Sequence, residues 1–133
     1  MATYKKLLKN RAGDIIIPVS EYDVYSTSEQ VAGVWIDGKT IYKKTVDCGD
    51  LVNTTYKAIA HGISNLACVI SATGMMQDKA TSNRRWRPLN IPNTNIQNYI
   101  IVEVDATYVW VYCGADRTNQ NAWVTLYYTK TTN

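Results

Sequence analysis

The stretch VAGVWIDGKTIYKKTV, residues 31–46, decides the fold class of this chain. Two strand-like runs, residues 31–36 and 39–46, flank the dipeptide Asp37-Gly38. Asp-Gly accepts the positive φ angles of a type I′ turn, and the twist of that turn matches the twist of a β-hairpin. The stretch therefore predicts an antiparallel hairpin.

The remainder of the 133 residues has the same β-rich character. Val, Ile and Thr number 12, 12 and 15, whereas Leu numbers 6 and Phe is absent. β-branched residues suit a pleated, half-buried surface, as do the 10 Tyr and 4 Trp side chains. The chain has neither an apolar run long enough to span a bilayer nor an N-terminal signal sequence, so we expect no membrane insertion.

Further strand-like runs occupy residues 51–59, 63–72, 99–105, 108–113 and 122–129. Residues 73–98 are read as long loops around one or two short strands, and residues 114–121 as a polar loop. In residues 99–105, Ile100, Val102 and Val104 alternate with Glu103 and Asp105. Short strands at this spacing are typical of all-β domains. We predict an antiparallel, jelly-roll-like β-sandwich over residues 29–133.

Residues 1–28 differ from this domain and are interpreted as an anchoring leader and linker. Residues 4–9 are basic and apolar, residues 10–13 are turn-like, and residues 14–18 are expected to form a short strand that Pro18 ends. The two halves could pair as a hairpin that is too small to bury a core of its own. We therefore expect residues 1–20 to dock against a partner protein or another copy of the chain.

Charge and cysteine content exclude several classes of function. The 14 basic and 11 acidic residues are dispersed, which favours a solvated surface over a nucleic-acid partner. Cys48, Cys68 and Cys113 are odd in number and widely spaced, so neither a disulfide framework nor a zinc site is expected, although a single disulfide stays open. Each thiol is expected to be a small buried hydrophobe in a protein made in a reducing compartment.

Residues able to support catalysis are sparse. The single histidine, His61, is interpreted as a turn residue or polar contact, because no GxSxG nucleophile sequence accompanies it. Glu103 and Asp105 share a face, either as a carboxylate pair for glycoside hydrolysis or as a solvent-facing strand edge. We favour the strand edge, and expect no catalytic site, no cofactor and no metal.

An aromatic stripe and two loops are the strongest candidates for binding. Tyr108, Trp110 and Tyr112 share one face of their strand, and three roles remain open: sandwich core, subunit interface or sugar-stacking platform. The same roles are open for Trp123, Tyr127 and Tyr128. The polar side chains of the loops suit hydrogen bonds to sugar hydroxyls or acidic groups, although solvation and pairing with carboxylates are alternatives. The candidate ligand-binding residues are Trp86, Asn119, Gln120, Asn121, Arg84 and Arg87.

Two segments resemble one known family in the expected order. Residues 34–45, VWIDGKTIYKKT, resemble the WIDGKxIYxKT segment that opens C-terminal domains of tailed-bacteriophage fibre and receptor-binding proteins. Residues 114–117, GADR, and 122–132, AWVTLYYTKTT, resemble the ending of those domains. The resemblance spans roughly residues 29–132, with no recognisable match in the stretch between the segments.

The resemblance implies a homotrimeric virion tip protein that is assembled in the bacterial host cytoplasm and binds a host cell-surface receptor, expected to be a glycan. Residues 1–20 would then contact other virion proteins, at a tail or a capsid position. Tyr108, Trp110 and Tyr112 are the candidate trimer interface. The alternative is a purely structural fibre or capsid decoration protein without its own ligand.

Overall fold

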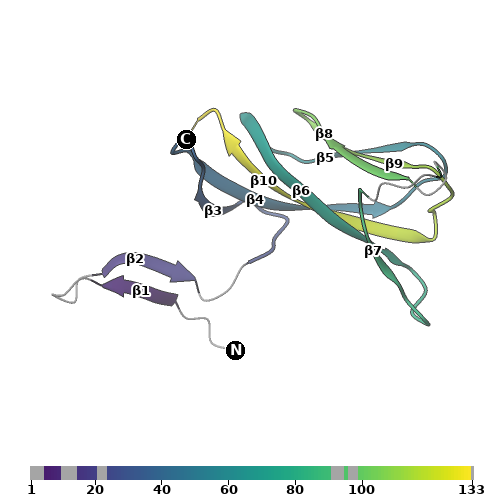
Figure 1. Ribbon diagram of the computed structural model, residues 1–133, viewed down its shortest axis with the longest axis horizontal. Helices are drawn as coiled ribbons and strands as arrows, with labels where there is room; N and C mark the ends of the chain where they lie inside the picture. Colours follow the sequence, from purple (N-terminus) through teal and green to yellow (C-terminus); the bar gives the residue numbers. More distant parts are fainter. Residues whose placement is uncertain (1–4, 10–14, 21–23, 91–94, 96–98, 133) are drawn as a thin grey trace.

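The computed structural model describes residues 5–9, 15–20, 24–90, 95 and 99–132 and forms antiparallel β-sheets throughout (Figure 1). A five-stranded sheet has the order β3-β4-β10-β6-β7, and a three-stranded sheet has the order β5-β9-β8. The first comprises β3 (Gln30–Val34), β4 (Thr40–Asp50), β10 (Gln120–Lys130), β6 (Leu66–Asp78) and β7 (Trp86–Pro88). The second comprises β5 (Tyr56–Ala60), β9 (Tyr108–Cys113) and β8 (Ile100–Val104). The predicted all-β sandwich is confirmed.

The β3–β4 hairpin forms as predicted, but its turn is not type I′. The Gly38 N–H donates to the Trp35 carbonyl over 2.9 Å, and the Trp35 N–H donates to the Lys39 carbonyl over 2.8 Å. Gly38 has a φ of 86°, whereas Asp37 does not have a positive φ. The loop is therefore a three-residue connection with glycine in the left-handed position. Asp37 instead accepts a hydrogen bond from the Lys39 N–H over 3.0 Å, which a carboxylate can do without a positive φ.

The core lies between the two sheets and is made by alternate residues of their strands. Strand β9 directs Val109, Val111 and Cys113 inward, and all three are fully buried. Strand β10, at the centre of the larger sheet, contributes its own buried row: Ala122, Val124, Leu126 and Tyr128. The inward alternation predicted for Ile100, Val102 and Val104 in β8 is also observed. Burial of this apolar surface is the main stabilising contribution to the sandwich.

The largest differences from the predicted strand boundaries are at the start of β5 and the end of β6. Residues 51–55 do not form a strand, apart from an isolated bridge between Asn53 and Asp116. Strand β6 extends to Asp78, six residues into the loop-rich stretch 73–98, because β10 pairs with it from Lys130↔Leu66 to Gln120↔Asp78. One of the short strands expected within this stretch is β7. The polar residues at the end of β6 do not stop the strand, because β10 continues to pair with their backbone.

The leader contains an antiparallel hairpin, in which β1 (Lys5–Lys9) pairs with β2 (Ile15–Ser20). The prediction that Pro18 ends the second strand is wrong, because Pro18 pairs with Leu7 and the strand continues to Ser20. Each strand of an isolated hairpin has an unpaired edge, where a residue without an N–H is tolerated. The predicted turn at residues 10–13 lies outside the described residues.

All three cysteines are free, so the open question of a disulfide is answered. Cys48 and Cys113 are buried, as predicted. The prediction is wrong for Cys68, which is exposed near the start of β6.

Candidate functional site

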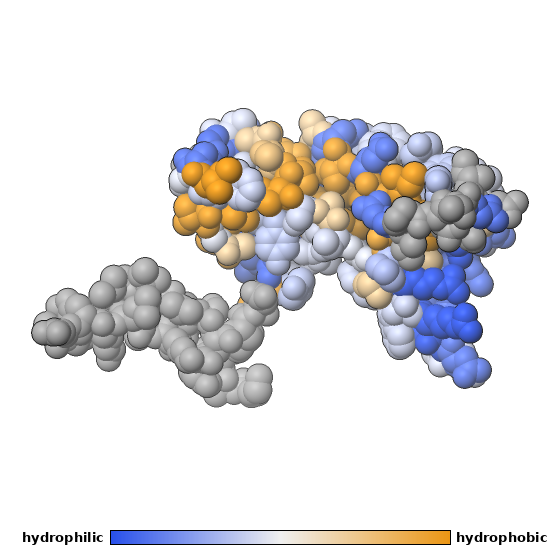
Figure 2. All heavy atoms as spheres, viewed as in Figure 1, coloured by the Kyte–Doolittle hydropathy of each residue, from blue (hydrophilic) through white to orange (hydrophobic). Residues whose placement is uncertain are grey.

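The two loops that supplied the candidate ligand-binding residues meet at one end of the sandwich. The Lys79 N–H donates to the Asn119 carbonyl over 3.0 Å, and Gln120 Nε2 donates to Asp78 Oδ1 over 2.8 Å. Between the loops lies a cleft of about 410 Å³, here called the tip cleft. Its lining residues are Asp78, Lys79, Ala80, Arg85, Arg87, Asp116, Arg117, Asn119 and Gln120. Figure 2 shows that the adjoining β6–β7 hairpin is covered by hydrophilic residues.

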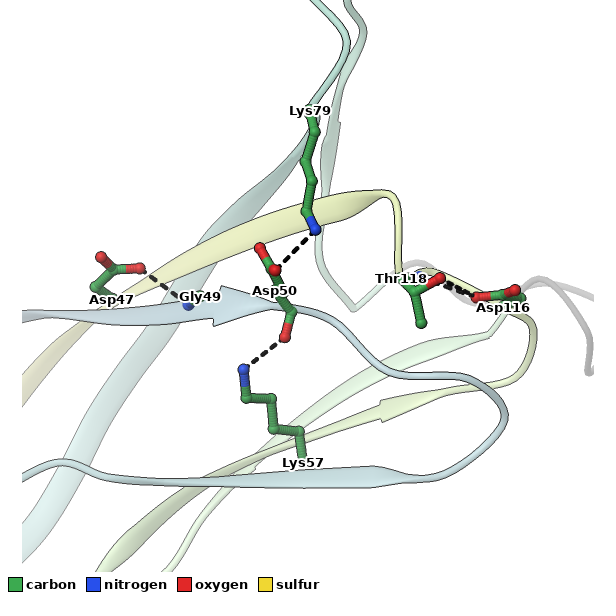
Figure 3. A network of polar contacts seen from close by, with 7 residues as sticks. All are labelled: Asp47, Gly49, Asp50, Lys57, Lys79, Asp116 and Thr118. Atoms are coloured by element: carbon green, nitrogen blue, oxygen red, sulfur yellow. Dashed lines mark hydrogen bonds and ion pairs between the residues drawn. The ribbon is translucent and has the colours of Figure 1, made fainter.

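Polar contacts from three strand ends hold the tip cleft in shape (Figure 3). The Lys79 ammonium forms a 2.7 Å salt bridge with the Asp50 carboxylate, and Lys57 donates to the Asp50 carbonyl. Asp116 accepts hydrogen bonds from the Thr118 backbone N–H over 3.0 Å and from the Thr118 hydroxyl over 2.7 Å. The contacts of Asp50 link the end of β4 to the β6–β7 loop and to β5, and the Asp116–Thr118 bonds fix the shape of the second loop. This lowers the entropic cost of ordering the loops around a ligand.

Both carboxylates of the tip cleft are held in the ionised form. Hydrogen bonds from the Gln120 side chain and the Arg85 backbone N–H lower the pKa of Asp78, and the charges of Arg87 and Arg85 lower it further. Hydrogen bonds from the Thr118 backbone and hydroxyl lower the pKa of Asp116. Each carboxylate therefore acts as a hydrogen-bond acceptor and not as a proton donor near neutral pH.

The structure separates the candidate ligand-binding residues into three groups. Asn119, Gln120 and Arg87 line the tip cleft. Trp86 and Asn121 are register neighbours of Gln77 and so share the opposite, outer face of the sheet. There the Trp86 indole N–H donates to Gln77 Oε1 over 3.0 Å.

The third group is Arg84, whose guanidinium donates to the carbonyls of Lys79 and Ala80 over 3.2 and 3.1 Å. These bonds close the turn between β6 and β7. The guanidinium is therefore engaged within its own loop.

The sequence prediction missed Asp78 and Lys79 as cleft residues. Both were assigned to a long loop, whereas Asp78 is the last residue of β6 and lies opposite Gln120 in the register. A period-two pattern continued through Met76 to Asp78 would have placed Asp78 on the same strand face as the core residue Met76, and hence beside Gln120. The pairing of Lys79 with Asp50 has no local signal in the sequence.

The aromatic stripe of β9 is not sandwich core, so that interpretation is wrong. Val109, Val111 and Cys113 pack inward and leave Tyr108, Trp110 and Tyr112 on the outer face of the three-stranded sheet. Tyr56, opposite Tyr112 in the register, joins the stripe with ring centroids 4.8 Å apart. The Trp110 ring centroid is 6.4 Å from that of Tyr56 and 5.6 Å from that of Tyr108. These four side chains form an outer aromatic face that is open to a partner or a ligand.

Asp105 fixes the orientation of the indole in this outer aromatic face. Its Oδ2 atom accepts a 2.7 Å hydrogen bond from Trp110 Nε1, while Oδ1 accepts the backbone N–H groups of Thr107 and Tyr108. The bond from Trp110 is the largest cause of the lowered pKa of Asp105, followed by the two backbone bonds. The Asp105 carboxylate is therefore used to position the turn and the indole.

A second outer surface lies on the five-stranded sheet. A groove of about 390 Å³, here called the outer groove, is lined by Tyr25, Thr73, Gly74, Met75, Pro88, Trp123, Thr125 and Tyr127. The Lys43 ammonium lies 4.1 Å from the Tyr25 ring centroid, in a cation–π contact at the edge of this surface. The aromatic residues of β10 therefore differ in role. Tyr128 is a core residue, whereas Trp123 and Tyr127 line the outer groove and are not core.

His61 makes two hydrogen bonds within the fold. Its Nδ1 accepts the Ile63 backbone N–H over 3.1 Å, so the ring carries its proton on Nε2, which donates to the Asp105 carbonyl over 2.9 Å.

Among the described residues, no group of three or more His, Cys, Asp or Glu side chains is arranged to hold a metal ion. Within the same residues, no helix has the length and apolarity required to cross a membrane.

Comparisons of the chain with protein-family models, with curated proteins and with solved structures find no match in any of the three.

Proposed function

We propose that this chain is a bacteriophage fibre or tip protein that binds a glycan on the host cell surface through the tip cleft. The observation that carries the proposal is the convergence of two polar segments, residues 78–87 and 116–120, at one cleft. Amide, guanidinium and carboxylate groups held on a rigid β-scaffold are suited to hydrogen-bonding sugar hydroxyls.

The position of the tip cleft supports a role in recognition. Glu29, the residue before β3, is bonded to Tyr128 and Lys130 at the C-terminal end of β10. Gln120, at the other end of this 11-residue strand, borders the cleft. At about 3.3 Å per residue, roughly 33 Å separates these two ends. The cleft therefore lies at the other end of β10 from Glu29, where the sandwich domain begins.

The phage assignment is supported by the residues that carry the family resemblance. Residues 34–45 comprise the end of β3, the hairpin turn and the first half of β4, and residues 122–132 include most of β10. These strands are neighbours at the centre of the larger sheet, with Lys43 opposite Tyr127 and Tyr42 opposite Tyr128. The two segments thus belong to one structural unit, which is expected of a shared domain type.

A glycan array probed with the full chain tests the proposal. We expect retention of at least one bacterial surface glycan, and loss of that signal on substitution of Asn119→Ala with Arg87→Ala at unchanged melting temperature. Trp86→Ala, on the opposite face of the sheet, is the matched control and should retain binding. Absence of any retained glycan contradicts the proposal, and a loss caused by Trp86→Ala alone moves the site to the outer face.

A second candidate function, a purely structural virion component, is favoured by a different observation. Val31, Val34 and Ile36 lie on or beside the edge strand β3 and are largely exposed, Ile36 to 90%. An apolar sheet edge of this kind is suited to contact with another protein chain. Two results together would favour this function. The chain is incorporated into particles normally, and particles that lack it adsorb to host cells equally well.

A further inference from the structure

The tip cleft has more positive than negative charge. Four basic side chains and two carboxylates line it, and both carboxylates already accept hydrogen bonds from neighbouring groups. Lys79 is paired with Asp50. The guanidinium groups of Arg85, Arg87 and Arg117 form no salt bridge within the part of the chain that the structure describes. Planar guanidinium groups match the oxygens of carboxylate and phosphate, so this surplus charge is suited to an oxyanion.

Two polar atoms at the wall of the tip cleft are buried without a partner. Gln120 is 5% exposed, and its Nε2 atom faces the Asp78 carboxylate, which can only accept hydrogen bonds. Gln120 Oε1 must therefore point elsewhere, and neither this atom nor Arg117 Nε has a hydrogen-bond partner among the described residues. Buried polar atoms are rarely left unpaired, so these two atoms mark unused hydrogen-bonding capacity beside the cleft.

The two unpaired atoms require different chemistry from the molecule that completes the site. Gln120 Oε1 needs a donor, whereas Arg117 Nε needs an acceptor. A bare oxyanion supplies only acceptors, whereas a sugar hydroxyl supplies both. None of the described residues that line the cleft is aromatic, so the cleft lacks the stacking surface on which nucleobases bind. Its volume of about 410 Å³ is within the range of small-molecule sites.

We propose that the tip cleft binds an anionic sugar, namely a hydroxyl-bearing ring that carries a carboxylate or a phosphate group. Arg85, Arg87 and Arg117 bind the oxyanion, and Gln120 accepts a hydrogen bond from a ring hydroxyl. This inference rests on the proposed glycan-binding function and names the class of sugar within it.

The test is a titration of the full chain with matched small sugars, followed by backbone amide NMR shifts of residues 79–87 and 114–121. The probes are methyl glucuronide, glucose 6-phosphate, neutral methyl glucoside, the uncharged methyl ester of the glucuronide, and inorganic phosphate. We expect at least one of the two anionic sugars to bind at least tenfold more tightly than the neutral sugars and inorganic phosphate. The carboxylate and phosphate arms identify which oxyanion is preferred.

Charge variants separate the cleft from general electrostatic attraction. Arg85→Gln and Arg87→Gln should each weaken binding of the preferred sugar about tenfold without a change in melting temperature. Lys39→Gln removes the same charge at the β3–β4 turn, at the opposite end of the sheet, and should leave binding unchanged. Equal weakening by all three variants contradicts a site in the cleft.

The remaining outcomes distinguish this inference from the proposed function. Equal or tighter binding of the neutral glucoside overturns the anionic sugar while glycan binding stands. Inorganic phosphate that binds as tightly as both anionic sugars also overturns it, because the ring then contributes nothing. Failure of these probes together with a blank glycan array contradicts both proposals.

Discussion

The hydroxyl of Tyr128, a fully buried core residue, donates a 2.7 Å hydrogen bond to the carboxylate of Glu29, the residue before β3. Lys130 donates to the other carboxylate oxygen over 2.8 Å. The first residue of the sandwich domain is therefore tied to β10, the last described strand. Burial raises the pKa of Tyr128, and the adjacent Glu29 carboxylate raises it further, so the phenol remains a donor.

The substitution Tyr128→Phe should lower the free energy of unfolding by about 1–2 kcal/mol, because it removes a hydrogen bond to the charged, partly exposed carboxylate of Glu29. A double-mutant cycle with Glu29→Gln, measured by urea denaturation, should show coupling between the two residues. Tyr112→Phe is the control, because the Tyr112 side chain lies on the outer aromatic face. Equal losses from both tyrosine variants would contradict the importance of this bond.

Stability should fall in acid. Partial burial alone would raise the pKa of Glu29, but hydrogen bonds from Lys130 and Tyr128 and nearby positive charge lower it below its ordinary value. The pKa values of Asp78, Asp105 and Asp116 are also lowered. Carboxylates with depressed folded pKa values stabilise the fold fully above their ordinary values, about 4, and lose that contribution as pH falls through the folded values.

The expected result is a roughly constant contribution from these carboxylates between about pH 8 and pH 5, then a progressive loss below about pH 4. Denaturation midpoints measured across this range check the prediction. The variant Asp105→Asn should show a smaller acid dependence than the natural chain. Stability that rises on acidification would reverse the predicted sign.

Gly74→Ala should destabilise the protein severely. A Cβ atom at this position would lie 2.2 Å from the Trp123 carbonyl oxygen, 3.0 Å from Leu89 Cδ1 and 3.1 Å from Val124 Cα. Two of these neighbours are backbone atoms of the central strand β10 and cannot rotate away, so we expect a loss of about 3 kcal/mol or failure to fold. The yield of soluble protein and urea denaturation measure this effect.

Gly33→Ala is the matched control for Gly74→Ala. Its added Cβ would meet only Ile41 Cδ1 at 4.0 Å, an ordinary contact on an edge strand. We expect a change within about 0.5 kcal/mol, as for most surface substitutions. Similar losses at both glycines would mean that the close approach of β6 to β10 is not the cause.

One cysteine per folded chain should react with iodoacetamide at neutral pH. Burial raises the pKa of the Cys48 thiol to about 11 and also raises the pKa of Cys113, so neither forms a thiolate readily. Cys68 is exposed. Intact mass after brief treatment should show one adduct when folded, none for Cys68→Ser, and all 3 thiols modified after denaturation. Rapid modification of Cys48 in the folded chain would contradict its burial.

The protein should be a homotrimer that uses the outer aromatic face as a subunit contact. Tyr56 and Tyr108 are 53% and 39% exposed in the single chain, and large exposed aromatic surfaces are typical of protein interfaces. Tyr108→Ser combined with Tyr112→Ser should release folded monomers, as seen by sedimentation velocity. A natural chain that is a stable monomer at micromolar concentration would exclude this assembly.

Local sequence was sufficient to predict the class of fold and several of its strands. The alternation in residues 108–113 matches β9 to the residue, and Asp37-Gly38 lies at the turn of a hairpin because few residues accept the backbone angles needed there. These features depend on neighbours within a few positions of each other. The exact turn geometry did not follow, because Asp-Gly is compatible with both two-residue and three-residue loops.

Tertiary structure alone decided which face of β9 is buried. Both faces of β9 are apolar, so the pattern could not choose between Val109, Val111 and Cys113 and the aromatic residues beside them. The face of β9 that enters the core is decided by the strand packed against it. Strand β10 presents Val124, Leu126 and Tyr128, and the smaller side chains of β9 fill the remaining space.

The tip cleft likewise depends on register over long distances. Asp78 meets Gln120 because β6 and β10 pair along their whole lengths, and Lys79 meets Asp50 because β4 and β6 both pair with β10. Sequence could name Asn119, Gln120 and Arg87 as polar candidates, but not that they share a cleft from which Trp86 is turned away. Successive residues of a strand point to opposite faces, so the register of β7 against β6 separates Trp86 from Arg87.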